Sequence, residues 1–395
     1  MKTIKYSKIK SCKSIGLQKT IDLEVNHSDH NFYCEGLVTS NSHAVSYAYL
    51  AVITAYLKFN YTTDFFAAQL NMARNEQDPF EHINNVVIEL PKFGIDLLQP
   101  DLAESKMDFT NEKGQIRYGL TSIKSISDST VKPLDTFVEL RKEGTNKFDI
   151  FLSAKQAKIG IGKLSALIQA GTLDSLGDDR TRMVLEAQSF NKLTDREKRN
   201  MVALGEKYNY DVLQIISSEV IQGKSVGDDG KPLMKESRFE TFKKDYDKYK
   251  AIYTQNKQYK TFADWYFEKF YLGYSYSHSL RSVFINKSEN LMNCEETLEA
   301  ESKEGVKLVG IIESARKSKS KKDTAYYRFN VVDETGKLNC LFFDPKLSNF
   351  LVNNDVPKKK DIVIIEGKKA EDNTVFVDTI KVLTDKIYVK LSEVK

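Results

Sequence analysis

Two adjacent residues near the start of the chain, Asn41 and Ser42, carry side chains that can take part in acyl transfer. The side-chain amide of Asn41 can attack its own main-chain carbonyl, which forms a succinimide ring and breaks the bond to Ser42. The hydroxyl of Ser42 is a nucleophile that accepts an acyl group once a base activates it. An isolated Asn-Ser pair is more typical of a turn, so the surrounding residues must decide between the two interpretations.

Short runs of alternating polar and apolar residues make residues 1–41 a small β-rich piece, with strands predicted at 20–25 and 31–38. A helix-rich sequence follows without a linker. The segments TIDLEV and DHNFYCEGLVTSN, followed by Ser, resemble the last two sequence blocks of inteins, which are self-splicing protein elements. Because Met1 stands only about forty residues before Ser42, the resemblance implies the C-terminal fragment of a split intein, whose larger partner is a separate chain.

The resemblance to inteins also implies roles for individual residues. Ser42 takes the acyl group from the upstream junction, Asn41 cyclises, and His30 with the adjacent Asp29 moves protons in both steps. Inteins usually have His just before the terminal Asn, whereas this sequence has Ser40. Cyclisation of Asn41 is therefore expected to depend more on His30.

A second resemblance begins at Ser42. The segment SHAVSYAYLAVITAYLKFNYTTDFFAAQLN predicts two helices and is similar to the end of the fingers region of the DNA polymerase III alpha subunit, a replicative C-family polymerase. The segments FGIDLLQPDLAESKMDFT, GQIRYGLTSIKSIS, LIQAGTLDSLGDDR and FYLGYSYSHSL follow at the intervals that this family shows. The resemblance covers most of residues 42–385, except for a poorly matching insertion at about 190–262.

In this family, the positions equivalent to residues 116–131 and 156–172 form paired helix-hairpin-helix elements, whose tight hairpins direct main-chain N–H groups at DNA phosphates. Glycine lets a backbone approach a phosphate closely, and residues 160–163, Gly-Ile-Gly-Lys, fit the second hairpin. The first hairpin has Ser125 and Ser127 where the family has Gly, so its phosphate contact stays open. A tight turn without DNA contact is the alternative for both. The residues expected at phosphates are Lys124, Gly160, Gly162 and Lys163.

Five strand-like runs fill residues 306–383, with a short helix near 347–351, which predicts a small OB-fold barrel. Its first long loop is basic, and aromatic residues alternate on the adjoining strands, although most of these must face the interior. A basic loop beside aromatics is typical of barrels that bind single strands, while a solvated charge run is the alternative. The loop residues are Arg316, Lys317, Lys319, Lys321 and Lys322, and the aromatics are Tyr326, Tyr327, Phe329 and Phe342.

The chain of 395 residues is therefore predicted to be multidomain, with a small β intein fragment, a mainly α-helical fingers and helix-hairpin-helix region, and a C-terminal β-barrel OB fold. A net charge of +4 is modest, so DNA binding must depend on local basic patches. The expected domains are 1–41, split-intein fragment; 42–105, end of the fingers; 106–189, helix-hairpin-helix region; 190–300, helical insertion and linker; and 306–385, OB fold.

Several other classes of site and location are excluded. No long uncharged apolar run predicts a membrane span, and four scattered cysteines without a CxxC pair indicate reduced thiols in the cytoplasm of a bacterial or phage-infected cell. The missing CxxC pair also argues against zinc at His27, His30 and Cys34. Residues 223–225 lack the upstream glycine of a phosphate loop, and residues 245–247 are interpreted as a solvated helix face.

Polymerase chemistry needs carboxylates that hold two metal ions, and no Asp-x-Asp strand matches them here. The family resemblance implies that these carboxylates and their Mg²⁺ lie in an N-terminal half bearing the N-terminal intein fragment. This chain is expected to hold no cofactor and no 3′-5′ exonuclease, and to bind primed DNA and single-stranded template. Residues 258–262, QYKTF, match a sliding-clamp motif poorly, which leaves that partner open. The alternative is a non-enzymatic DNA-binding protein with a vestigial intein tail.

We predict that Asn41→Ala abolishes release of the C-terminal body, because no succinimide can form. Ser42→Ala should instead block ligation and leave some cleavage after Asn41. Mass spectrometry of the products after co-expression with the N-terminal half distinguishes the two outcomes. Full spliced product from Asn41→Ala would show that the intein interpretation is wrong.

Overall fold

The computed structural model describes residues 31–34, 37–40, 44–126, 128–143, 146–177, 179–221, 226–227, 230–285, 288, 290–319 and 325–383. The chain forms two compact units, Met1–Thr62 and Thr63–Lys395. Asp29, His30, Asn41 and Ser42 lie outside the described residues, as does the strand predicted at 20–25. Among the described residues, no helix is both long and apolar enough to cross a membrane.

The first unit contains a β-hairpin followed by one helix. Strands β1 (Asn31–Cys34) and β2 (Leu37–Ser40) pair antiparallel, with Asn31 opposite Ser40. The run 31–38 was predicted as one interrupted strand, and the structure corrects this to two strands. Helix α1 (Ala44–Asn60) follows, as the apolar pattern predicted.

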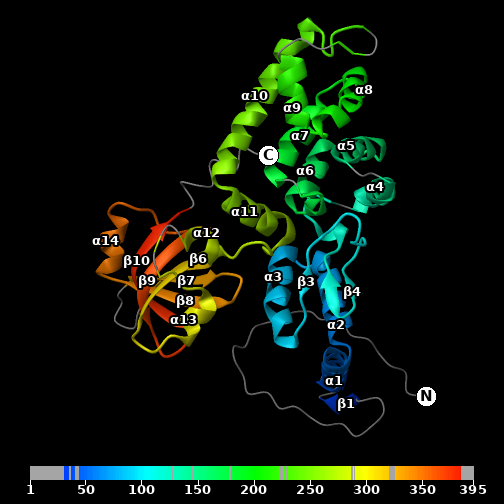
Figure 1. Ribbon diagram of the computed structural model, residues 1–395. Coiled ribbons are helices and arrows are strands. Elements are labelled where there is room, and N and C mark those ends of the chain that lie inside the picture. The colour runs from blue at the N-terminus through cyan, green and yellow to red at the C-terminus, as the bar shows by residue number, and fades with distance from the viewer. Residues whose placement is uncertain are drawn as a thin grey trace, which may run out of the picture. The chain divides into compact units, whose positions relative to one another are not determined.

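The second unit begins with helices and a small sheet (Figure 1). The sheet has the order β3-β5-β4, in which β5 pairs parallel with β3 and antiparallel with β4. The elements are α2 (Thr62–Met72, which starts at the last residue of the first unit), α3 (Pro79–Glu89), β3 (Leu97–Leu98), β4 (Thr110–Glu112), β5 (Gln115–Arg117), α4 (Val131–Glu143), α5 (Lys147–Gln156), α6 (Ile161–Gln169), α7 (Arg180–Asn191), α8 (Asp195–Ala203), α9 (Val212–Ile215), α10 (Glu236–Gln258), α11 (Lys260–Leu272), α12 (Leu280–Phe284) and α13 (Cys294–Glu299).

Local sequence signals explain where these helices start. The side chains of Asn146 and Asp179 accept the amide N–H groups of the first turns of α5 and α7. Thr194 and Glu197 form a reciprocal capping box at the start of α8. The apolar faces of these helices meet in one core, in which Phe66, Phe137 and Phe148 are fully buried.

A closed five-stranded barrel follows the helices. Its strands are β6 (Gly305–Lys319), β7 (Ala325–Val332), β8 (Lys337–Phe343), β9 (Ile362–Lys369) and β10 (Thr374–Val382), and helix α14 (Lys346–Leu351) lies between β8 and β9. The strand order is β10-β8-β7-β6-β9, and β10 also pairs with β9, which closes the barrel. Side chains of alternate residues fill the interior. The predicted OB-like barrel is confirmed.

Helices α11 and α12 pack on the outside of the barrel. Phe262, Trp265 and Phe284 are buried against the barrel residues Val309 and Ile364. The indole N–H of Trp265 donates to a carboxylate oxygen of Glu334 at 2.7 Å, and the other oxygen accepts the amide of Leu280 at 3.2 Å. The barrel is therefore attached through both apolar packing and directional bonds.

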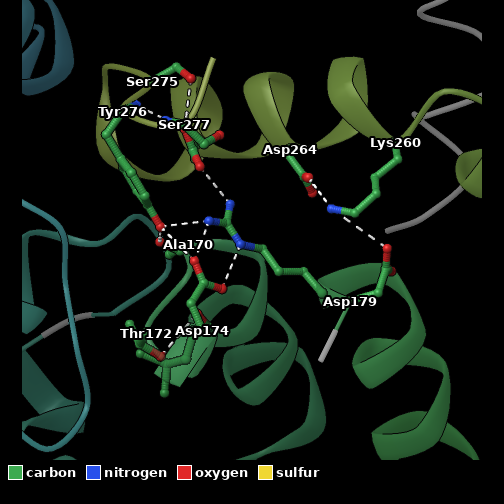
Figure 2. Close-up of polar contacts among 12 residues, drawn as sticks. Ala170, Thr172, Asp174, Asp179, Lys260, Asp264, Ser275, Tyr276 and Ser277 are labelled. Carbon is green, nitrogen blue, oxygen red and sulfur yellow. Dashed lines mark hydrogen bonds and ion pairs between the residues drawn. The ribbon is translucent and has the colours of Figure 1, made fainter. Parts of the chain in front are cut away.

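On the side of the hairpin helices, α11 is held by a buried ion pair. The guanidinium of Arg180, at the start of α7, donates to Glu268 of α11 at 2.7 Å and to both carboxylate oxygens of Asp174. Glu268 also accepts the hydroxyl of Ser275 at 2.6 Å and the amide of Tyr276 at 2.9 Å. Asp174 and the hydroxyl of Tyr276 meet at the same guanidinium nitrogen, and this hydroxyl donates to Asp174 at 3.2 Å (Figure 2). Burial lowers the pKa of Arg180, but the hydrogen bonds to Asp174 together with the nearby charges of Tyr276, Glu268 and Asp174 more than offset this and raise the pKa.

We predict that Glu268→Gln lowers the free energy of unfolding by about 3–5 kcal/mol, because it breaks a buried ion pair and removes one of the two carboxylates that balance the charge of Arg180. The same substitution at Glu366, a half-exposed carboxylate paired with Lys307 at 2.7 Å, should cost about 1 kcal/mol or less. Urea titration followed by circular dichroism measures both variants. Equal losses would show that the Arg180–Glu268 pair contributes no more than a surface ion pair.

Candidate nucleic-acid interface

The second predicted hairpin is a tight turn between α5 and α6. The amide of Lys158 donates to the carbonyl of Lys155 at 3.0 Å, and the amide of Ile159 donates to Ala154 at 2.8 Å, which ends α5. Lys158 has a φ of 61°, the left-handed conformation that favours glycine. Gly160 then caps α6. Ile159 is buried and anchors the turn to the core.

Gly160 and Gly162 occupy open space. A Cβ built on either glycine would meet no atom of the chain within 4 Å, and neither has a positive φ. By contrast, Gly171 has a φ of +87°, and its Cβ would lie 1.8 Å from the Tyr276 hydroxyl. The chain itself therefore requires Gly171 but places no such demand on Gly160 or Gly162. The amides of Ile161 and Gly162, the first two of α6, have no acceptor within the helix, whereas the amide of Lys163 donates to the carbonyl of Gly160 at 3.0 Å.

Lys163, predicted at a phosphate, connects the two hairpins. Its ammonium donates to the hydroxyl of Thr130 at 2.5 Å. Thr130 ends the short 3₁₀ helix Asp128–Thr130 and is buried. Lys163 therefore lies against the first hairpin, a role that its position in the motif did not indicate.

The first hairpin retains a left-handed turn despite its serine. Ser125 has a φ of 78°, so it adopts the conformation that a glycine would take. The amide of Lys124 donates to the carbonyl of Tyr271 at 2.9 Å, and its ammonium lies 3.7 Å from the centre of the Phe270 ring. Lys124 is exposed, whereas Ser127 lies outside the described residues.

On the barrel, part of the segment that was predicted to be a basic loop belongs to a strand instead. Strand β6 extends to Lys319, so Arg316, Lys317 and Lys319 belong to a strand and are exposed there. Arg316 stands opposite Arg328 of β7, and the two line a cavity of about 290 Å³. The remaining two predicted residues, Lys321 and Lys322, lie outside the described residues.

The aromatic residues of the barrel divide between its two faces. Phe329 and Phe342 are buried and Tyr327 packs on the same core. Tyr326 stacks on Phe343 with ring centres 5.0 Å apart, and the Phe343 ring lies 6.1 Å from that of Phe376.

Sequence reasoning missed three residues on the outer face: Arg328, Phe343 and Phe376. The alternation of side chains within each strand could have placed Arg328 and Phe343 there, because each neighbours a residue expected inside. Phe376 is on β10, which pairs parallel with β8. That long-range pairing gives no local signal.

The structure also bears on three other features of the sequence: the carboxylates at 245–247, a metal site and the clamp-like segment. Asp245 pairs with Lys192 at 2.8 Å. In the described part of the chain, no group of three or more His, Cys, Asp or Glu residues is arranged to hold a metal ion. Phe262 of the clamp-like segment is buried between α11 and the barrel, so this conformation does not present its ring to a partner.

We predict that Lys158→Gly and Ser125→Gly each raise the free energy of unfolding by about 0.5–1 kcal/mol, because glycine adopts a positive φ without strain. Gly in place of the exposed Lys243, within α10, should lower it by about 1 kcal/mol. Thermal unfolding monitored by calorimetry checks the signs. Destabilisation by all three changes would exclude strain at the two hairpin positions.

Residues 94–183 match the family of the helix-hairpin-helix motif. The DNA polymerase III subunit alpha of Aquifex aeolicus is 29% identical over 154 residues, which are 39% of this chain and 13% of that protein. The Bacillus subtilis subunit is 30% identical over 165 residues, 41% of this chain and 14% of that protein. The Escherichia coli subunit is 27% identical over 178 residues, which are 44% of this chain and 15% of that protein. The chain thus spans a small part of the curated relatives it matches.

Solved structures with some likeness include the telomere capping protein Ten1 from Saccharomyces pombe, at 15% identity and a TM-score of 0.19, covering 27% of this chain and 96% of that one. The mitochondrial single-stranded DNA binding protein Rim1 from S. cerevisiae has 19% identity and a TM-score of 0.19. The match covers 21% of this chain and 97% of that chain. Likenesses of this size carry no argument about function. The chain therefore contains a helix-hairpin-helix module, and over that region it is similar to the DNA polymerase III subunit alpha.

Proposed function

We propose that the chain is the DNA-binding C-terminal part of a replicative polymerase of the polymerase III alpha type, joined to its N-terminal half by protein splicing. The hairpin between α5 and α6 holds duplex DNA, and the barrel holds the single-stranded template. The polymerase carboxylates and their Mg²⁺ belong to the other half. The chain alone therefore incorporates no nucleotide.

The observation that carries duplex binding is the open space at Gly160 and Gly162. Neither the backbone conformation nor any neighbour within the chain requires glycine there. A side chain at either position would instead obstruct a molecule that approaches the hairpin from outside. The amides of Ile161 and Gly162 are suited to a phosphate, because they have no acceptor within the helix and lie at the positive end of the helix dipole.

Single-strand binding rests on the outer face of β7, β8 and β10. Tyr326, Phe343 and Phe376 form a row of neighbouring rings, and Arg316 and Arg328 lie beside it on β6 and β7. Rings of this kind stack on bases of any sequence, and cations beside them neutralise phosphates. In an OB fold, the face of the second and third strands is the usual surface for oligonucleotides.

Helix α1 supports the need for another half. A helix that is apolar all round is normally buried, yet its large apolar side chains are exposed, and Phe59 is 85% exposed. A partner that covers α1 would remove this apolar surface from water. The exposed residues are Tyr47, Tyr49, Leu50, Val52, Ile53, Tyr56, Leu57 and Phe59. The proposal of protein splicing rests on the residues of the intein-like segment alone.

We predict that two sets of substitutions separate the two kinds of DNA binding. Gly160→Val with Gly162→Val should weaken duplex binding and leave single-strand affinity unchanged. Phe376→Ala should weaken single-strand binding roughly tenfold, because one stacked base contributes about 1–3 kcal/mol. Fluorescence anisotropy with labelled duplex and single-stranded DNA measures both, using the full chain.

The matched control for Phe376→Ala is Val352→Ala, another exposed apolar residue of the barrel domain, which should change neither affinity. Equal losses on both substrates from either set would show that the division between hairpin and barrel is wrong. Primer extension by the chain alone would contradict the assignment of the catalytic residues to the other half. The unspliced chain and its co-expressed N-terminal half should together yield a polymerase.

A further inference from the structure

A cavity of about 190 Å³ opens beside the second hairpin. Gly160 and Ile161 form one wall of this cavity, which places the start of α6 at its edge. Three lysines line the remainder: Lys155 from α5, Lys158 from the turn and Lys198 from α8. Phe151 and Phe190 supply apolar walls. The cavity therefore combines a helix N-terminus with several cations.

Lys198 is the unusual member of this group. Its residue is only 7% exposed, and long cationic side chains are rarely buried without a partner. Its ammonium lies 5.7 Å from the centre of the Phe190 ring. Within the part of the chain that the structure describes, this ammonium forms no hydrogen bond or ion pair.

The surrounding charges favour an anion in the cavity. Burial lowers the pKa of Lys198, and the positive charge of Lys155 lowers it further, while Asp195 and Glu197 act in the opposite direction. Asp195 is itself paired with Lys155. Lys158 is exposed and keeps a left-handed φ that glycine would adopt without strain. An oxyanion would supply Lys198 with the hydrogen-bond partner that the chain does not.

We infer that this cavity binds one phosphate of the duplex backbone, held by the amides of Ile161 and Gly162 at the start of α6 together with Lys198 and Lys158. Lys198 lies on α8, beyond the residues 94–183 that match the helix-hairpin-helix motif. The helical insertion thus completes the phosphate site of the hairpin. This inference rests on the proposed duplex binding and adds a binding residue from outside the motif.

Lys198→Met tests the inference, because methionine preserves the apolar packing on Phe190 and removes the charge. Duplex affinity should fall roughly tenfold, the loss typical of one charge-assisted hydrogen bond. The slope of log K against log salt should fall by about 0.9, the value for one phosphate contact. Anisotropy of the full chain with labelled duplex DNA, at a series of salt concentrations, gives both quantities.

Lys243→Met, on the exposed face of α10 and outside the cavity, is the matched control and should change neither quantity. Unchanged binding by Lys198→Met, or equal losses from both variants, would overturn the inference while wild-type binding upholds the proposed function. Absence of duplex binding by the wild type would overturn the proposed function itself. If Lys198→Met fails to fold, Lys158→Gly decides, because it should weaken binding while the chain becomes more stable.

Discussion

The buried ion pair between Arg180 and Glu268 fixes the position of α11, and the positions of the hairpin and the barrel relative to α11 depend on it. Glu268 is fully buried and accepts bonds from Arg180, Ser275 and Tyr276. Trp265, about one turn before Glu268 on α11, packs against the barrel. One helix is thus bonded both to the segment after α6 and to the OB-like barrel. A buried charge is an expensive way to join elements, but its bonds have direction, which apolar packing lacks.

The sequence predicted the elements better than it predicted their pairings. The five strands of the barrel and the helix between the third and fourth of them follow from local alternation and turn residues, and they appear where expected. The outer aromatic row was missed, because Phe376 is brought beside Phe343 by the parallel pairing of β10 with β8. The extent of β6 was also missed, because lysines and serines give little strand signal while pairing with β7 continues to Lys319.

At the hairpins, the motif located the site but not the roles of its members. Gly160 and Gly162 face open space, as expected for positions that an external ligand approaches. Lys163 contacts Thr130, since the two hairpins pack together in three dimensions. Lys198 could not be found from the motif at all, because α8 is far from α6 in sequence and reaches the cavity only through tertiary packing. The splicing residues lie outside the described part of the chain, so their roles rest on sequence alone.

Closure of the barrel sets an order of events during synthesis. Strand β10 pairs with both β8 and β9, so the barrel cannot close until residue 382 has left the ribosome. The helices up to α11 can already form the Arg180–Glu268 pair by then, because both residues precede the barrel in the chain. The nascent helical part would meanwhile expose the face of α11 that carries Trp265. The interval between these two steps is when this face is open to wrong contacts, such as those that chaperones prevent.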